Sequence, residues 1–275
     1  MTLSTIRNNP AKQKKVKTKK QKAIAATCAV AFWLLVWHVV SLCVGSELVL
    51  VSPVKVVQTL FTVIFDPDFL KTVWYSAARI LGGFFTALTL GTVLGWVASR
   101  FWVVETLLRP ITAVIKATPV ASFIILVLLW FSGKNLSVII SMLMVFPIIY
   151  MNVLEGIRSA DEKLLEMAQV FRLSVGKKLL YIYLPAVAPF FVSACSVSLG
   201  LCWKSGIAAE VIGTPDGSIG AVFYQAKIFL QTSELLAWTV VVVFISVAFE
   251  KLFMLLLRLI LKKLKMEDML NGKRA

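Results

Sequence analysis

The chain has 275 residues, of which 59% are hydrophobic and only 16% are charged, and its mean hydropathy is +0.86. Soluble domains carry about 25% charged residues, so this composition excludes an ordinary soluble enzyme domain and indicates an integral membrane protein. The net charge of +15 would suggest nucleic-acid binding in a soluble protein. Here the basic residues lie beside apolar runs, where they set membrane orientation. We therefore expect membrane lipid, and no nucleic acid, as a partner.

Residues 1–22 form a basic segment that we predict to be a cytoplasmic tail. It carries eight positive charges and no acid, and it stops directly before the apolar run 23–44. A secretory signal peptide has a shorter apolar stretch and a small-residue cleavage site. This run is 22 residues long and contains Trp33 and Trp37. The sequence therefore predicts a retained first transmembrane helix over 23–44.

Apolar runs later in the chain predict further membrane crossings. About 20 apolar residues cross the hydrocarbon core of a bilayer, and on that scale the sequence predicts six transmembrane helices, near 23–44, 78–98, 118–132, 136–154, 186–206 and 236–260. The third of these is the shortest. The apolar stretch 101–115 before it is expected to add a helix that lies along the membrane or partly within it. The predicted fold class is all-α, a polytopic membrane protein.

The distribution of basic residues predicts the orientation of these crossings. In the six-helix arrangement, 22 Lys and Arg residues fall on the side of the two termini and four fall on the opposite side. Cytoplasmic segments carry the excess of positive charge, so both termini are predicted to be cytoplasmic. The segment 45–77 is then external, residues 78–261 form the core transmembrane domain, and 262–275 form a cytoplasmic C-terminal tail.

Small residues recur every four positions in the second predicted crossing, at Gly83, Ala87, Gly91 and Gly95. Small residues on one face of a helix let a second helix approach closely. The pattern predicts a packing seam, either within the chain, which we favour, or between subunits.

The segment 155–185 is a long cytoplasmic loop with helical signals. Ser159 and Glu162 have the spacing of a capping box that opens a helix, and Ser174 is expected to cap a second short helix. The first helix carries an apolar stripe made of Leu164, Leu165, Met167, Ala168, Val170 and Phe171. These side chains must pack on the rest of the chain or on a separate cytoplasmic subunit, and spacing alone leaves both open.

Polar residues and helix breakers near the fifth crossing suggest a site within the membrane. Lys204 and Glu210 are six residues apart, which places them about 120° from each other on a continuous helix, so they need not pair. The glycines and proline between 213 and 220 are predicted to break the helix. Irregular backbone at membrane depth lines a cavity or is buried in protein. The candidate pathway or gate residues are Lys204, Glu210, Gly213, Pro215, Gly217 and Gly220.

A structural interpretation of the two charged residues stays open beside the functional one. Lys204 could attract an anionic solute, or it could extend to the outer interface of the membrane. Glu210 could belong to a gate, or it could cap a helix or bond to Arg79.

Metal and disulfide chemistry are not expected from this sequence. The four cysteines lie in apolar runs without a CxxC pair, and His38 is the single histidine. A phosphate-binding G-x-x-x-x-G-K-[ST] loop does not occur in it either. We therefore predict a non-catalytic chain with no catalytic residue, cofactor or metal of its own.

The loop residues resemble the cytoplasmic EAA loop, E-A-A-x3-G-x9-I-x-L-P, of permeases of binding-protein-dependent ABC importers. Glu166, Met167 and Ala168 stand at the EAA positions, and Ile182, Leu184 and Pro185 follow in register. Met167 replaces the first alanine, and Arg172 occupies the glycine position. Because glycine there permits a positive φ, the turn could use a different backbone geometry in this chain.

Other segments resemble the nitrate, sulfonate and taurine branch of these permeases, so that the resemblance covers roughly residues 45–260. They are Ser52-Pro53 with Val56-Val57, Ser76-Ala77-Ala78-Arg79 with Gly83-Phe84, Lys116-Ala117-Thr118-Pro119-Val120, and Ala208-Ala209-Glu210-Val211-Ile212-Gly213. Relatives of this branch serve nitrate, sulfonates, taurine and other small solutes including vitamin precursors, and the cargo is selected by the binding protein.

The resemblance implies a type I importer fold in a bacterial cell membrane. It implies two permease chains, expected here as a homodimer, with an external solute-binding protein and separate ATPase subunits that hold ATP and Mg²⁺. The loop helix from Glu166 to Phe171 would fit a groove in the ATPase, so the predicted coupling residues are Glu166, Met167, Ala168, Phe171, Arg172, Ile182, Leu184 and Pro185.

Two other classes of membrane protein are alternatives to an ABC importer permease. An ion-coupled secondary transporter predicts inverted repeats and charged residues near the midplane. An intramembrane enzyme needs a nucleophile with its base, or a metal pair, inside a span. The sequence offers neither a repeat nor such a pair, and the secondary transporter is kept as the alternative.

Overall fold

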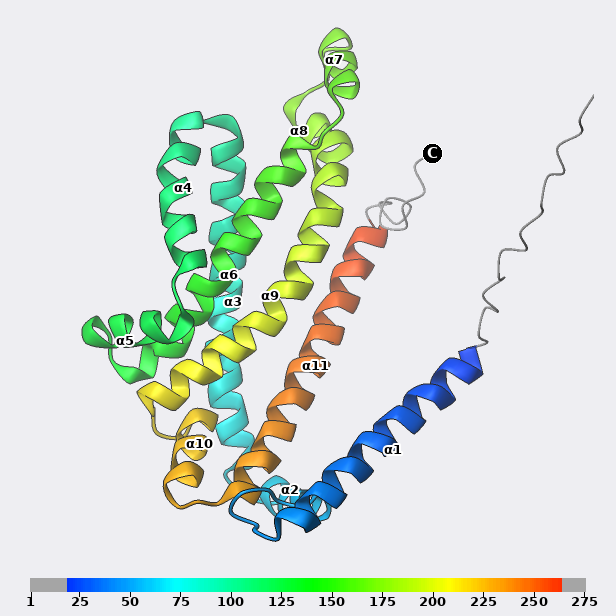
Figure 1. The fold of residues 1–275 in the computed structure, drawn as a ribbon. Helices are drawn as coiled ribbons and strands as arrows, with labels where there is room; N and C mark the ends of the chain where they lie inside the picture. Colours follow the sequence, from blue (N-terminus) through cyan, green and yellow to red (C-terminus); the bar gives the residue numbers. More distant parts are fainter. Residues whose placement is uncertain (1–18, 264–275) are drawn as a thin grey trace, which may run out of the picture. The chain divides into compact units, whose positions relative to one another are not determined.

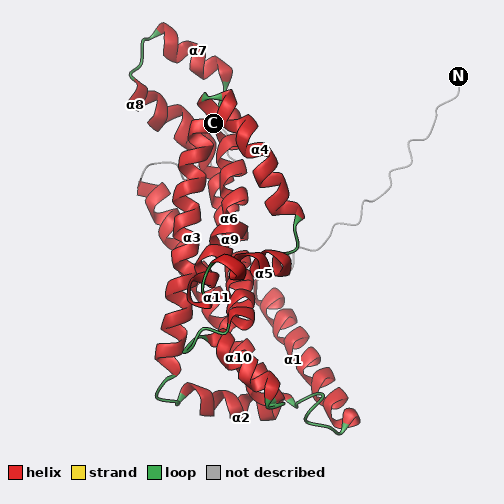
Figure 2. Cartoon of the chain, turned by 90° about the vertical axis from the view of Figure 1, so that its left-hand side faces the viewer, coloured by secondary structure: helices red, strands yellow, loops and turns green. Residues whose placement is uncertain are grey.

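The computed structural model describes residues 19–263, and residues 1–18 and 264–275 lie outside the described residues. Most of the predicted N-terminal and C-terminal tails therefore falls outside the description. The described residues form helices joined by short turns, with no strand among them, which confirms the all-α prediction (Figures 1 and 2). The elements are α1 (Lys19–Val44), α2 (Pro53–Ile64), α3 (Phe69–Arg100), α4 (Trp102–Ala117), α5 (Val120–Trp130), α6 (Gly133–Arg158), α7 (Glu162–Val170), α8 (Val175–Lys178), the π-helix η1 (Leu179–Tyr183), α9 (Leu184–Gly213), α10 (Ile219–Ile228) and α11 (Thr232–Lys263).

The chain divides into two compact units, residues 1–55 and residues 56–275. The first unit contains α1, whose apolar part Ile24–Val44 has a mean hydropathy of 2.1. Large apolar side chains such as Phe32 and Trp33 are exposed along it. A helix of this length and composition is suited to cross a bilayer with its side chains in lipid.

Five helices are long and apolar enough to cross a membrane: α1, α3, α6, α9 and α11. They correspond to five of the six predicted crossings. The start of α3 lies at Phe69, nine residues before the predicted 78. The segment 45–77, predicted to be external, contains α2 and the first turns of α3. Thr72 and Ser76 made these turns look polar, yet both are buried.

The predicted crossing at 118–132 is wrong as a single continuous helix. The helix there, α5, has 11 residues, which at 1.5 Å per residue spans about 17 Å against a hydrocarbon core of about 30 Å. It is joined to α4 at a bend of 111°. Thr118 is extended at this bend, with ψ 132°, because a residue before proline avoids the helical conformation. The bent pair can count together as a sixth span.

The two segments also run in different directions. Figures 1 and 2 show α4 running along the bundle beside α3 and α6, and α5 running across it. The stretch 101–115, expected to lie along the membrane or partly within it, thus forms the part that follows the bundle axis. Hydropathy does not reveal which of the two helices follows the bundle axis. The shorter helix α5 is the more apolar one, so a hydropathy criterion selects it as the crossing instead of the longer α4.

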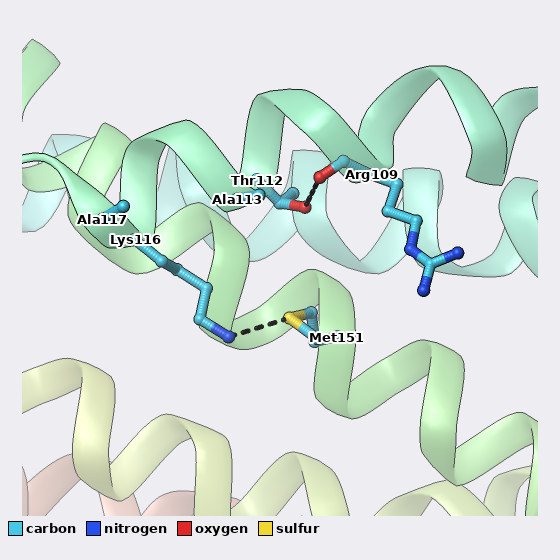
Figure 3. A pocket seen from close by; sticks show the side chains of 6 residues that line it. All are labelled: Arg109, Thr112, Ala113, Lys116, Ala117 and Met151. Atoms are coloured by element: carbon cyan, nitrogen blue, oxygen red, sulfur yellow. Dashed lines mark hydrogen bonds between the residues drawn. The ribbon is translucent and has the colours of Figure 1, made fainter.

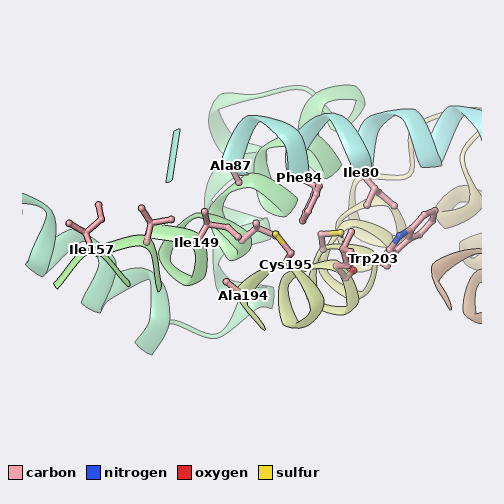
Figure 4. Close-up of a cluster of buried hydrophobic side chains, with 12 residues drawn as sticks. Ile80, Phe84, Ala87, Ile149, Ile157, Ala194, Cys195 and Trp203 are labelled. Carbon is pink, nitrogen blue, oxygen red and sulfur yellow. Dashed lines mark hydrogen bonds between the residues drawn. The ribbon is translucent and has the colours of Figure 1, made fainter. Parts of the chain in front are cut away.

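The main core of the second unit lies between α3, α6 and α9 (Figure 4). Ile80 and Phe84 of α3 are fully buried there, as are Ile149 of α6 and Leu199 of α9. Trp203 closes one end of this cluster. Burial of large apolar side chains is the main stabilising contribution in such a contact when water or lipid is excluded, so these three helices form the rigid frame of the unit.

The predicted small-residue seam lies against α6 of the same chain. A Cβ atom added at Gly83 would be 2.4 Å from the carbonyl oxygen of Val138, and one added at Gly91 would be 3.0 Å from the Cβ of Ile149. A Cβ atom added at Gly95 would be 3.0 Å from the carbonyl oxygen of Tyr150, and the side chain of Ala87 is fully buried. The seam therefore brings two backbones of one chain together.

We predict that Gly83→Ala destabilises the protein while Gly82→Ala does not. An added methyl group at Gly83 overlaps the α6 backbone, and overpacking of this kind costs about 1–3 kcal/mol. At Gly82 nothing lies within 4 Å of the added atom, and alanine is the better helix former. The measurement is the thermal unfolding midpoint of the purified protein in detergent. Equal midpoints for the two variants would contradict the close contact at the seam.

Candidate functional site

The loop predicted at 155–185 folds as two short helices at one end of the bundle (Figure 2). The chain leaves α6 after Arg158, forms α7, turns, and returns through α8 and η1 directly into α9. The second short helix is thus the first turn of a long continuous element. A π-turn at Leu179–Tyr183 precedes Pro185, which cannot donate a backbone hydrogen bond and excludes regular packing of the preceding turn.

The predicted capping box at Ser159 and Glu162 is wrong. Asp161 is the N-cap of α7, and its Oδ1 accepts a hydrogen bond from the Lys163 backbone N–H at 2.9 Å. Ser159 instead follows the last residue of α6, and its hydroxyl donates to the Gly156 carbonyl at 2.9 Å. Two capping residues lie within three positions here, and only the actual end of α6 decides which helix each one serves.

The turn after α7 keeps a left-handed residue at the position where the EAA pattern has glycine. Arg172 has φ 48°, which is the left-handed conformation that a glycine at this position permits. The Leu173 N–H donates to the Ala168 carbonyl at 2.9 Å, and the Arg172 N–H donates to the Gln169 carbonyl at 3.0 Å. These two bonds form a Schellman motif. A left-handed non-glycine residue costs about 1–2 kcal/mol, and the motif holds Arg172 in that conformation.

The apolar residues of α7 divide between two faces rather than forming one stripe. Ala168 is fully buried in a small cluster with Ala160 and Ile182, and Leu165 and Leu173 pack against it. This cluster fixes α7 on the start of the α9 element. Ala168 and Ile182, two of the predicted coupling residues, are therefore internal packing residues.

The opposite face of the loop exposes apolar side chains. Phe171 is 71% exposed, Val170 78% and Val175 80%, and Met167 is half exposed. Glu166 and Arg172 are exposed beside them, whereas Leu184 and Pro185 are half-buried at the start of α9. An exposed apolar patch rimmed by charges is typical of a surface that binds another protein. We refer to Met167, Val170, Phe171 and Val175 as the loop patch.

An ion pair connects the base of this loop to α4. Arg158, the last residue of α6, pairs with Glu105 in the first turn of α4. Sequence spacing gave no sign of this pair, because the two residues are 53 positions apart. The pair therefore links the base of the loop to α4 as well as to α6.

An open hollow of about 400 Å³ lies beside α4 and α6 (Figure 3). Its lining includes Arg109 and Lys116 from α4 and Met151 from α6. The Lys116 Nζ lies 3.5 Å from the Met151 Sδ. From the sequence, these two basic residues contribute only to the predicted positive charge of a cytoplasmic loop. Their seven-residue spacing, which places them on one face of a helix, was the signal that could have found them.

Glu210 belongs to a buried junction between α3, α9 and α10. Its Oε2 accepts a hydrogen bond from the Ser76 hydroxyl at 2.7 Å and a longer one from the Gly220 N–H at 3.3 Å. The Ser76 oxygen in turn accepts from the Ile219 N–H at 2.9 Å. The carboxyl group thus satisfies the start of α10 and ties it to α3.

Gly220 is placed where α10 touches the backbone of α9. A Cβ atom added there would lie 2.2 Å from the Cβ of Glu210, so the close approach requires glycine. Gly213 ends α9, and the following Thr214 is left-handed, with φ 40°. The structure therefore breaks the helix only over residues 214–218. The predicted break extended to 220, but Ser218 caps α10 by accepting from the Ala221 N–H.

The remaining predicted gate residues differ in exposure. Gly217 has a positive φ of 75° in the turn between α9 and α10, and Pro215 is buried there. Lys204 is exposed on α9, whereas Glu210 is fully buried. The two do not pair. Arg79 lies over the ring of Tyr75, with 4.4 Å between its Cζ and the ring centroid, and no ion pair joins it to Glu210 among residues 19–263.

Comparison with known proteins identifies the family of this chain. Residues 87–266 match the family described as the binding-protein-dependent transport system inner membrane component, so the chain belongs to that family. Its members are permease subunits of ABC importers, and this class of protein is distinct from the ion-coupled secondary transporters.

Three relatives show the branch within the family. The chain is 28% identical to SsuC of Bacillus subtilis (strain 168), whose name assigns it to aliphatic sulfonate transport, over 83% of each chain. It is 27% identical to the taurine transport system permease protein TauC of Escherichia coli (strain K12), over 78% of this chain and 80% of that one. It is 26% identical to the nitrate import permease protein NrtB of Synechocystis sp., over 74% and 76%. The chain is an ABC importer permease of the nitrate, sulfonate and taurine branch.

We predict that Arg172→Gly stabilises the turn after α7 by about 1 kcal/mol, because glycine adopts a positive φ without steric cost. Arg172→Ala is the matched control, since it removes the same charge and keeps the strain. The measurement is amide hydrogen exchange at Leu173, whose N–H closes the motif. Equal protection in both variants would show that charge, and not backbone conformation, determines the stability of the turn.

We predict that Glu210→Ala lowers stability by about 1–3 kcal/mol, because buried donors from Ser76 and Gly220 then lose their acceptor. Glu210→Gln keeps a carbonyl oxygen at the same place and should retain most of the stability. Thermal unfolding midpoints of the two variants and the wild type provide the comparison. If the glutamine variant fell as far as the alanine variant, the negative charge rather than the hydrogen bonds would hold the junction.

Proposed function

We propose that two copies of this chain together form the route of a small anionic solute through a bacterial cell membrane. An external solute-binding protein delivers the solute, and ATP and Mg²⁺ are bound by separate ATPase subunits. The chain itself carries no catalytic group in this proposal. Sulfonate, taurine and nitrate, which the names of the relatives give, share an anionic oxygen-bearing group and define the solute class.

The observation that supports the coupling role is the two-sided construction of α7. Its inner face is fixed by Ala168 and Ile182, and its outer face presents the loop patch. A surface that is apolar and rigidly supported can transmit a displacement of its partner to the helices below. The continuous path from α8 through η1 into α9 and the Arg158–Glu105 pair give the displacement two ways into the bundle.

The distribution of charge supports a cytoplasmic position for the loop patch and for both termini. Basic residues are concentrated near this end of the second unit, at Lys163, Arg172, Lys177 and Lys178 in and beside α7 and α8. Cytoplasmic segments of membrane proteins carry such an excess. The α10 end would then face the binding protein, with the buried Glu210 junction holding α10 in place.

The exposed positive charge of Lys204 supports the proposal that the solute is anionic. It is exposed on a membrane-spanning helix, and Val197 lies seven residues before it on the same exposed line of α9. A lysine is costly in lipid, so this face of α9 is better suited to a partner permease or to the solute route.

We predict that Glu166→Ala combined with Phe171→Ala weakens binding of the ATPase subunit about tenfold or more, because an exposed aromatic anchor of an interface contributes about 2 kcal/mol. The matched control is Phe229→Ala, which removes a phenylalanine that is 70% exposed beyond the last turn of α10. The measurements are retention of the co-expressed ATPase on the tagged permease and ATP hydrolysis by the reconstituted complex.

The thermal unfolding midpoint of the permease should stay unchanged in both variants, because these side chains are exposed. Retention and hydrolysis at wild-type values in the loop variant would contradict the coupling role. An equal loss in the Phe229→Ala control would show that the effect is not specific to the loop.

A further inference from the structure

One face of α4 is polar along its whole length, although the helix runs beside membrane-spanning helices. Glu105, Arg109, Thr112 and Lys116 recur at spacings of three and four residues, which places them on one face. The opposite face is apolar and exposed, and consists of Val103, Leu107, Ile111 and Val114. The apolar face suits lipid, so the polar face is directed away from it.

The polar face lines the hollow beside α6. Arg109, Thr112 and Lys116 all belong to the lining, together with Met151 (Figure 3). A second hollow of about 250 Å³ adjoins it through Arg109, Thr112 and Met151, and its lining also includes Glu105, Glu155 and Arg158 at the base of the loop. The two hollows therefore form one open groove between α4 and α6.

Among residues 19–263, no acidic side chain lines the first hollow, whereas Glu105 and Glu155 line the adjoining one. Glu105 is paired with Arg158 and does not line the first hollow. Among residues 19–263, no ion pair is formed by Arg109 or Lys116. The only contact of the Lys116 amine in Figure 3 is the Met151 sulfur, which is a weak acceptor. The Thr112 hydroxyl donates to its own helix, at the carbonyls of Leu108 and Arg109.

The position of Lys116 argues against a simple loop charge. It lies fourteen residues after the first residue of α4, which corresponds to about 21 Å along the helix. The bend at Thr118 and Pro119 follows directly and turns the chain across the bundle. Two cations that form no ion pair among residues 19–263 need water or an anion beside them.

We propose that this hollow binds the oxyanion group of a small solute through Arg109 and Lys116. A guanidinium group can bind two oxygens of a sulfonate or nitrate side by side, and an ammonium group contributes a point charge. The phosphate of an anionic lipid headgroup has the same chemistry and is the second possible source of the group. The identity of the anion as cargo rests on the proposed function, whereas the binding itself does not.

The test uses one cysteine as a reporter of the local potential. Ala113 is exposed and lines the hollow, so Ala113→Cys places a thiol there. The exposed Cys28 and Cys43 are replaced by serine, and the buried Cys195 and Cys202 are kept. The full-length permease is placed in phosphatidylcholine nanodiscs. Labelling rates are measured with sulfonatoethyl and trimethylammonioethyl methanethiosulfonate, and a neutral methyl reagent controls for access.

With Arg109 and Lys116 present, we expect the anionic sulfonatoethyl reagent to label the thiol faster than the cationic trimethylammonioethyl reagent does. The ratio of the anionic rate to the cationic rate should fall about fivefold or more with Arg109→Gln plus Lys116→Gln, because two nearby positive charges are lost. The matched control is Arg100→Gln plus Lys177→Gln, which removes the same charge from exposed positions outside the hollow. A ratio that is unchanged by the first pair, with the neutral rate preserved, would overturn the proposal.

Competition then identifies the source of the oxyanion. Ethanesulfonate or nitrate that slows labelling in phosphatidylcholine supports a solute site, with chloride at equal ionic strength as the control. Slowing only after phosphatidylglycerol is added supports a lipid headgroup site. If neither the added anions nor phosphatidylglycerol slows the labelling, oxyanion binding at this hollow is overturned. The assay needs no ATPase and no binding protein, so its failure is separate from a failure of the coupling experiment.

Discussion

The backbone contact between α3 and α6 is the constraint on which the second unit depends. Glycines at 83, 91 and 95 let the two helices approach until the Cβ positions of α3 meet the α6 backbone. The approach aligns Ile80 and Phe84 with α9 and closes the core. Because α6 is held on one side by α3 and on the other by α9, its C-terminal end at Arg158 is a fixed base for the loop between α6 and α9 and for the ion pair to α4.

Polar groups decide how the ends of the bundle are built. At one end, Glu210 and Ser76 bind the first amides of α10, so a carboxyl group that is costly to bury acts in addition to the Ser218 cap. At the other end, the Schellman motif at Arg172 closes α7 without glycine. Both ends use hydrogen bonds to fix elements that bury few apolar side chains. Between them, α4 carries charges along a groove that remains open.

The spans and the loop register could be predicted from the sequence because they depend on local patterns. Apolar runs of more than 18 residues identify α1, α3, α6, α9 and α11 whatever their partners are. The EAA register is likewise a spacing of residues within one loop, from Glu166 to Pro185. Element ends were less certain: α3 begins nine residues early because Thr72 and Ser76 are polar yet buried, and Ser159 closes one helix although its spacing also fits the start of the next.

The sequence by itself determined the class of protein, the all-α fold, most of the spans and the family, because hydropathy, charge bias and motif spacing are properties of neighbouring residues. Only the tertiary structure decided that α4 follows the bundle while α5 crosses it, that Glu210 meets Ser76, and that Arg109 and Lys116 share a hollow with Met151. These facts depend on contacts between residues tens of positions apart, which no local pattern specifies. The left-handed conformation of Arg172 is of the same kind, since hydrogen bonds and packing around it, rather than its own preference, hold the backbone there.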